Sequence, residues 1–198
     1  MAKFIATLLS IMLLAASCGP KGFIKGEYSE DVNEENLLDD RWSETDMQKV
    51  VHDLVEKLVN HRSIKNAKTP PIVMVTRLQN KTSEHIDTQS IMDMVRVELT
   101  NSGNVRFVDK AAREDVAEEY DYQNSGMVSR ETKKGKGGQI GADFIINGRL
   151  DSIVKDINKK KTVYYKVTLN MTNLTTNLIE WTGYKQLRKN YKKRRLGM

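Results

Sequence analysis

Apolar residues recur at helical spacing in two stretches of the chain. In the first, residues 47–59, they are separated by three positions and by one, with polar residues between them. This spacing predicts an amphipathic helix with one apolar side. Thr45 is its expected N-cap, with Gln48 three residues later as in a capping box. The second amphipathic helix is expected over residues 88–101, and a third helix, rich in Ala and Glu, over residues 110–122.

Shorter apolar or alternating stretches predict the strands. Residues 72–78, 105–108 and 144–150 are mainly apolar, and each is long enough for one buried strand. In residues 163–172 apolar and polar positions alternate, which is typical of a strand with one buried and one solvent-facing side. Residues 178–184 are expected to return beside it. The pattern therefore predicts a half-buried, mostly antiparallel sheet of four to five strands.

The first apolar run differs from all of these, because it has the features of a secretion signal. It covers residues 4–14, and a helix that spans a bilayer needs about 20 apolar residues. Small residues then lead to Cys18, the only cysteine of the chain. Residues 14–18 (LAASC) resemble the bacterial lipobox, which implies removal of residues 1–17 and attachment of acyl chains to the Cys18 thiol. The alternative is an ordinary signal peptide followed by a chance cysteine.

Charge divides the remaining chain into two parts. Residues 19–40 contain two lysines and seven acidic residues and show neither a helical nor a strand period. We therefore expect the lipidated cysteine and a flexible acidic linker over residues 18–40. A basic globular domain is expected over residues 41–198. It ends in a basic tail, residues 185–195, which either contacts anionic surfaces in a salt-sensitive way or is simply solvated.

The sequence contains no recognisable catalytic or metal-binding motif. His52, His61 and His85 are scattered without the spacing of metal ligands. Neither a G-x-S-x-G nor an H-E-x-x-H motif is present. The Gly- and Lys-rich residues 133–138 lack the spacing of a P-loop and indicate a mobile loop leading into a short helix. A binding or regulatory protein without a cofactor is therefore expected, rather than an enzyme.

The motifs, taken in order, resemble one family, the LpoB-type lipoprotein activators of penicillin-binding proteins. After the lipobox the resemblance is carried by residues 41–46 (RWSETD), 71–75 (PIVMV) with 80–82 (NKT), 105–109 (VRFVD), 141–148 (GADFIING) and 174–183. It implies an α/β (α+β) fold similar to the N-terminal domain of TolB, with helices packed on both faces of a small mixed sheet. It also implies an outer-membrane lipoprotein that faces the periplasm and activates a bifunctional peptidoglycan synthase. Gly19 after the cysteine agrees with sorting to the outer membrane. We expect a monomer that binds no nucleic acid.

Two features depart from the family pattern. The linker is short, with Pro20 as its only proline, and the C-terminal end is strongly basic. Two other functions therefore stay open. One is an envelope assembly or secretion lipoprotein related to CsgG-like curli export proteins. The other is an envelope anchoring protein whose basic surface holds anionic wall or lipid groups.

Partner-binding residues are expected on both sides of residues 141–143. Alternation along residues 144–150 places Asn147 and Arg149 together on one face of the strand. Arginine suits an interface because its planar head stacks and forms paired hydrogen bonds. The family resemblance, aligned on Gly141, places the family's partner-binding arginine at Arg130. It places the family's tyrosine at Asn147, where this chain departs from the family pattern. We expect Arg130, Lys134, Asn147 and Arg149 to form the site, unless Arg130 is only a solvated loop residue.

Overall fold

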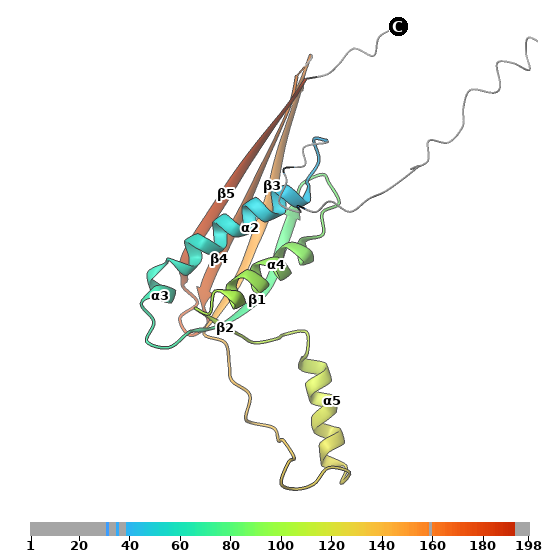
Figure 1. Ribbon diagram of the computed structural model, residues 1–198, viewed down its shortest axis with the longest axis vertical. Coiled ribbons are helices and arrows are strands. Elements are labelled where there is room, and N and C mark those ends of the chain that lie inside the picture. The colour runs from blue at the N-terminus through green and yellow to red at the C-terminus, as the bar shows by residue number, and fades with distance from the viewer. Residues whose placement is uncertain (1–30, 32–34, 36–38, 159, 193–198) are drawn as a thin grey trace, which may run out of the picture. The chain divides into compact units, whose positions relative to one another are not determined.

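The computed structural model describes residues 31, 35, 39–158 and 160–192. The expected signal segment, Cys18 and residues 193–195 of the expected tail lie outside the described residues. Helices and strands alternate in the first half of the described chain, and three strands complete it (Figure 1). In chain order the elements are α2 (Glu44–Val59), α3 (Arg62–Lys65), β1 (Ile72–Lys81), α4 (Thr88–Asn101), β2 (Arg106–Phe107), α5 (Arg113–Asn124), β3 (Phe144–Ile157), β4 (Lys160–Asn173) and β5 (Ile179–Lys192).

The strands form one mixed sheet in the order β2-β1-β3-β4-β5. The pairs β2–β1 and β1–β3 are parallel, whereas β3–β4 and β4–β5 are antiparallel. The expected fold class, a small mixed and largely antiparallel sheet with helices, is therefore confirmed. Gly148 is required where β3 and β4 meet, because a Cβ atom there would stand 2.3 Å from the carbonyl oxygen of Thr168.

Four of the strands are longer than the sequence pattern indicated, and one of them is β1, which continues to Lys81. β3, β4 and β5 each contain 14 residues. The expected strands 144–150 and 178–184 therefore continue to Ile157 and Lys192. β1 ends opposite Asp151, so that residues 152–157 of β3 pair with β4 alone among the described strands. Most of the expected basic tail is in fact the second half of β5.

Helix α2 begins two residues earlier than expected, because its N-cap is Ser43 and not Thr45. The side chain of Ser43 accepts a hydrogen bond from the Asp46 N–H, and the Asp46 carboxylate accepts one from the Ser43 N–H. This reciprocal pair is the capping box. Thr45 and Gln48 were the wrong pair, because Thr45 already lies inside the helix, where it is buried.

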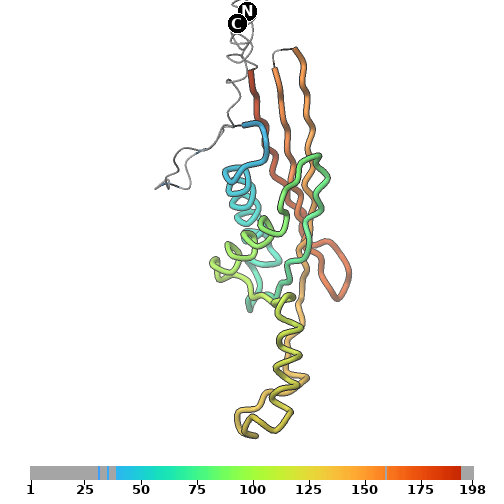
Figure 2. Tube along the Cα trace, turned by 90° about the vertical axis from the view of Figure 1, so that its right-hand side faces the viewer, coloured from blue at the N-terminus to red at the C-terminus, as the bar shows by residue number. Residues whose placement is uncertain are grey.

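The two long helices lie on the same face of the sheet, and not on both faces as the family resemblance implied. α2 contacts β5, α4 contacts β1, and the two helices contact each other. Figure 2 shows both on one side of the strands. The reason is that each long strand has only one apolar side, and only that side gains from being covered. The largest fully buried core side chains are Tyr165, Leu54, Leu58, Ile91, Met92, Leu99, Ile146, Leu150, Leu169 and Met171.

Helix α5 and the segment that follows it form an arm beyond the end of the sheet (Figures 1 and 2). No residue of α5 is buried. Residues 125–143 contain neither a helix nor a strand, so the short helix expected after residue 138 is absent from this described segment. The arm, defined here as residues 113–143, is therefore held mainly by its own contacts and by its two ends.

Candidate partner-binding face

The sheet face opposite α2 and α4, called the open face below, is polar and has no described helix over it. Strict alternation along β4 produces the difference between the faces, because its odd-numbered residues from 163 to 171 are buried and the even-numbered ones are not. The same alternation continues in β3 and β5. The open face is formed by Ile145, Asn147, Arg149, Asp151, Ile153 and Lys155 of β3, Thr162, Tyr164, Lys166, Thr168, Asn170 and Thr172 of β4, and Thr182, Tyr184, Gln186, Arg188 and Asn190 of β5.

A cation and an exposed aromatic ring meet at the centre of the open face. Tyr184 is 54% exposed, and the Nζ atom of Lys166 lies 5.3 Å from the centroid of its ring. In the same row of the sheet, Thr168 of β4 separates Tyr184 from Arg149 of β3. The Arg149 Nε atom donates to Asp151 Oδ2 at 2.9 Å, which orients the guanidinium. Tyrosine and arginine are enriched among the residues that dominate protein interfaces.

The predicted site residues lie in two separate places. Asn147 and Arg149 share the open face, as the alternation of residues 144–150 predicted. Arg130 and Lys134 belong to the arm, where Arg130 is exposed and the Lys134 N–H donates to Gln123 Oε1 of α5 at 2.6 Å. Both pairs are close in sequence to residues 141–143, but they are not close in space. The arm joins β3 at its first residue, Phe144, and does not run along the open face of the strand.

The basic residues of β5 are also divided between the two faces. Lys185 and Lys189 point toward α2, where the Lys185 Nζ atom lies 2.8 Å from Asp53 Oδ1. Burial alone would raise the pKa of the Asp53 carboxyl, but hydrogen bonds from Lys185 and Lys57 hold it below its ordinary value. Arg188 lies on the open face and forms no ion pair with any described residue. Sequence reasoning missed this division because it treated the basic run as a tail, although Leu187 and Tyr191 continue the strand alternation.

Lys189 forms the most buried ion pair of the described chain. Its Nζ atom lies 2.5 Å from Asp46 Oδ2, and both side chains are only 5% exposed. The same ammonium donates to the carbonyl oxygen of Arg41 at 2.6 Å. The capping carboxylate of α2 thereby also holds the segment before the helix against β5. We call this segment, residues 39–43, the strap.

Trp42 and Glu84 fix the other side of the strap. Glu84 Oε2 accepts a hydrogen bond from the Trp42 N–H at 2.9 Å, and Glu84 Oε1 accepts one from the Tyr165 hydroxyl. The Trp42 and Tyr165 rings meet edge to face with centroids 5.3 Å apart. Burial, and then the hydrogen bond to Glu84, raise the pKa of Tyr165. These contacts were not expected from the sequence, because their partners are 42 and 81 residues apart.

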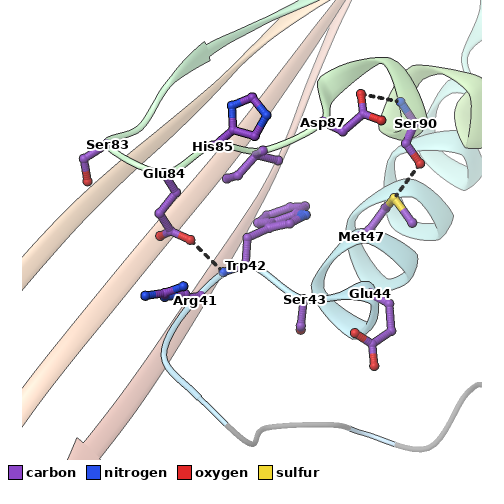
Figure 3. A pocket seen from close by; sticks show the side chains of 11 residues that line it. Arg41, Trp42, Ser43, Glu44, Met47, Ser83, Glu84, His85, Asp87 and Ser90 are labelled. Carbon is purple, nitrogen blue, oxygen red and sulfur yellow. Dashed lines mark hydrogen bonds between the residues drawn. The ribbon is translucent and has the colours of Figure 1, made fainter. Parts of the chain in front are cut away.

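A cavity of about 670 Å³ opens beside Trp42, between the strap and residues 83–90 (Figure 3). Both carboxylates on its residue 83–90 side already have structural roles. Glu84 holds the strap, and the Asp87 side chain accepts from the N–H groups of Gln89 and Ser90 as the N-cap of α4. The cavity is therefore part of the scaffold that fixes where the strap enters the domain.

In the part of the chain that the structure covers, no group of three or more His, Cys, Asp or Glu side chains is placed to hold a metal ion. Nor does any helix in that part have the length and apolar character to cross a membrane. What the geometry offers is a surface for binding, with a closed core behind it.

Comparison with known proteins assigns this binding domain to a family. A family model described as "Peptidoglycan-synthase activator LpoB" matches residues 43–187. The chain therefore belongs to the LpoB family of peptidoglycan-synthase activators, which is a regulatory and not a catalytic family, and the resemblance seen in the ordered motifs is confirmed. No sequence among the curated proteins matches the chain.

Several solved structures are similar to the domain. The LpoB C-terminal domain from Salmonella enterica has 15% sequence identity and a TM-score of 0.46, with 72% of this chain and 98% of that chain covered. The LpoB C-terminal domain from Escherichia coli has 13% identity and a TM-score of 0.46 with the same coverage. The NMR structure of E. coli LpoB has 13% identity and a TM-score of 0.41, and the match covers 87% of this chain and 84% of that one.

Proposed function

We propose that the protein is an outer-membrane lipoprotein, acylated at Cys18 and facing the periplasm, that binds and activates a bifunctional peptidoglycan synthase. The observation that supports this proposal most strongly is family membership over residues 43–187. The lipobox at residues 14–18 supports the anchor. Two or more acyl chains make a long-lived anchor, because each buried methylene contributes about 0.8 kcal/mol.

We further propose that the synthase docks on the centre of the open face, around Asn147, Arg149 and Tyr184. Three observations support this surface. It is uncovered, it presents cations and an exposed ring, and it is carried by paired strands and not by a loop. A rigid surface lowers the entropy cost of binding. Activation then requires that the domain bind the active conformation of the synthase more tightly than the inactive one.

The strap gives the linker a fixed starting point on the domain. Lys161 forms an ion pair with Asp40, and the Tyr191 hydroxyl donates to the Asp39 carbonyl oxygen. From this point, the 20 residues 19–38 would reach on the order of 70 Å if fully extended. This extended length of the linker determines whether the domain, anchored in the outer membrane, can contact a synthase in the inner membrane.

The proposal is tested by adding the mature, acylated protein in detergent to a purified bifunctional synthase and measuring glycan polymerisation and crosslinking. The wild type should stimulate the synthase. Arg149→Glu should weaken binding by roughly 2 kcal/mol, the level of an interface hot spot. The fold should be retained, because the partly exposed ion pair with Asp151 that this variant loses contributes at most about 1 kcal/mol. Arg62→Glu, an equal charge change at an exposed residue of α3, is the matched control and should behave like the wild type. Absence of stimulation by the wild type would refute the function, and full stimulation by Arg149→Glu would refute the surface.

The anchor has a test of its own. Cys18→Ala should leave the protein uncleaved or mislocalised, while the domain folds as before. Metabolic labelling with a fatty-acid analogue should mark the wild type and not the variant. Equal labelling of the two proteins would show that the acyl chains are not on Cys18.

A further inference from the structure

The open face continues beyond the region assigned to the synthase and contains a hollow there. The hollow has a volume of about 700 Å³. Its lining residues belong to β3, β4 and β5, mostly where these strands extend past the end of β1, and the extension of the strands is seen in Figure 1. Two successive rows of the sheet form its floor. It is lined by Ile153, Lys155, Thr162, Tyr164, Gln186, Arg188 and Asn190.

The charge of the hollow indicates an anionic ligand. Lys155 of β3 and Arg188 of β5 stand on either side of the β4 strand. Neither forms an ion pair with any described residue, and no carboxylate lines the hollow. The next acidic side chain along this face of β3 is Asp151, which is already bound to Arg149. Two cations without a counter-charge in one concave surface attract anions selectively.

The groups between the two cations favour a sugar polymer over an acidic protein. The Thr162 hydroxyl donates to Asn190 Oδ1 at 2.9 Å, which leaves the amide NH₂ group of Asn190 to donate to a ligand. Gln186 adds a second amide, and Tyr164 adds an aromatic ring with a polar end. A protein hot spot is expected to fill a well-packed apolar pocket, whereas Ile153 is the only aliphatic side chain that lines this hollow.

We propose that the hollow binds an anionic glycan strand that carries acetamido and carboxylate groups. Lys155 and Arg188 bind its carboxylates, Asn190 and Gln186 bind its acetamido groups, and the Tyr164 ring lies against a sugar. The identification of this glycan as peptidoglycan rests on the proposed function, because that polymer is the product of the synthase. The protein then holds the polymer and its synthase on adjacent parts of one sheet face.

The test is co-sedimentation of the full mature protein with purified sacculi, in the absence of any synthase. Lys155→Gln combined with Arg188→Gln should lower the affinity for sacculi about tenfold, which is the loss expected from one or more charge-assisted hydrogen bonds. Arg62→Gln combined with Lys65→Gln removes one exposed Arg and one exposed Lys from α3 and is the matched control. Binding should also weaken as salt rises, because partly exposed charges are screened.

The outcomes separate the hollow from the synthase surface. Loss of sacculus binding by the Lys155/Arg188 variant, with normal stimulation of the synthase, supports the proposal. Equal binding by both double variants, or equal loss in both, overturns it, since only overall charge would then matter. Normal sacculus binding with lost stimulation also overturns it, and identifies the hollow as an acidic-protein site. If the double variant does not fold, the proposal is tested by NMR titration of the wild type with soluble glycan fragments. Chemical-shift changes at residues 153–155 and 186–190 support the proposal, and changes confined to other residues overturn it.

Discussion

The two faces of the sheet use the same residue types for different purposes. On the helix-covered face, Lys189 is buried and bonded to Asp46 and to the strap. On the open face its neighbour Arg188 is exposed and has no ion-pair partner among the described residues. One position along β5 therefore separates a structural cation from one that is available to a ligand.

This difference shows that the number of basic residues in a segment does not measure its capacity to bind anions. Of the four basic side chains between residues 185 and 192, Lys185 and Lys189 already neutralise carboxylates of α2. Only the two basic side chains on the open face, Arg188 and Lys192, contribute to the positive electrostatic potential that a binding partner would experience. The same division applies to β4, where Tyr165 is buried in the core and Tyr164 lines the hollow.

The largest expected difference between the two faces is in stability, and the variants Lys189→Ala and Arg188→Ala measure it. Removing one partner of a buried ion pair leaves the other charge buried, which costs about 3 kcal/mol or more. Lys189→Ala should therefore lower the free energy of unfolding by about 3 kcal/mol, measured by urea denaturation. Arg188→Ala should change it by less than about 0.5 kcal/mol, as is usual for a surface substitution. Equal effects of the two variants would show that the division of β5 between the faces is wrong.

Replacing Arg130 tests whether the arm extends the synthase-binding surface beyond the sheet. Arg130→Glu should weaken synthase binding by roughly 2 kcal/mol if the arm contributes a hot spot, and it should leave the melting temperature unchanged because Arg130 is exposed. Titration calorimetry of the purified pair measures the change. Binding equal to that of the wild type would confine the surface to the open face and leave Arg130 as a solvated residue.

A smaller effect is expected from the tyrosines of β4. Tyr165→Phe removes the hydroxyl that binds Glu84 and leaves that carboxylate oxygen without its donor, at a cost of about 1–2 kcal/mol. Tyr164→Phe on the opposite face should change stability by less than about 0.5 kcal/mol. Urea denaturation of both variants gives the comparison. A Tyr164 effect as large as that of Tyr165 would contradict the assignment of the two faces.

Much of this division could be predicted from the sequence, because the period of two along β4 assigns every residue of that strand to a face. The helix 88–101 was predicted with its observed bounds for a similar reason, since its apolar residues repeat at helical spacing. The length of β5 was missed because lysines on the inner face interrupt its apolar pattern. Those lysines are tolerated only because Asp46 and Asp53 stand opposite them. A pairing between residues more than 100 positions apart has no local signal.

The candidate site was predicted only in part, for the same physical reason. Asn147 and Arg149 were placed together by strand alternation, which is a local rule. The position of Arg130 depends on the path of the arm, and residues 125–143 have no period that specifies one. The hollow was missed as well, because Lys155 and Arg188 belong to strands that the sequence pattern ended too early.

The smallest expected effect concerns the pH dependence that the helix-covered face gives to the fold. The pKa of Asp53 lies below its ordinary value in the folded protein, because Lys185 and Lys57 offset the effect of burial. Near the ordinary carboxyl pKa the unfolded chain therefore binds more protons than the folded one, so this contribution is present above that pH and is lost as the pH falls through the folded pKa. Asp53→Asn should remove this part of the acid dependence and cost between about 0.2 and 1 kcal/mol at neutral pH, the range for partly exposed pairs. In a double-mutant cycle, Lys185→Gln should have little further effect once Asp53 is replaced. Additive losses would instead mean that Lys185 acts through another carboxylate, and that the ion pair seen between β5 and α2 does not contribute to the stability of the covered face.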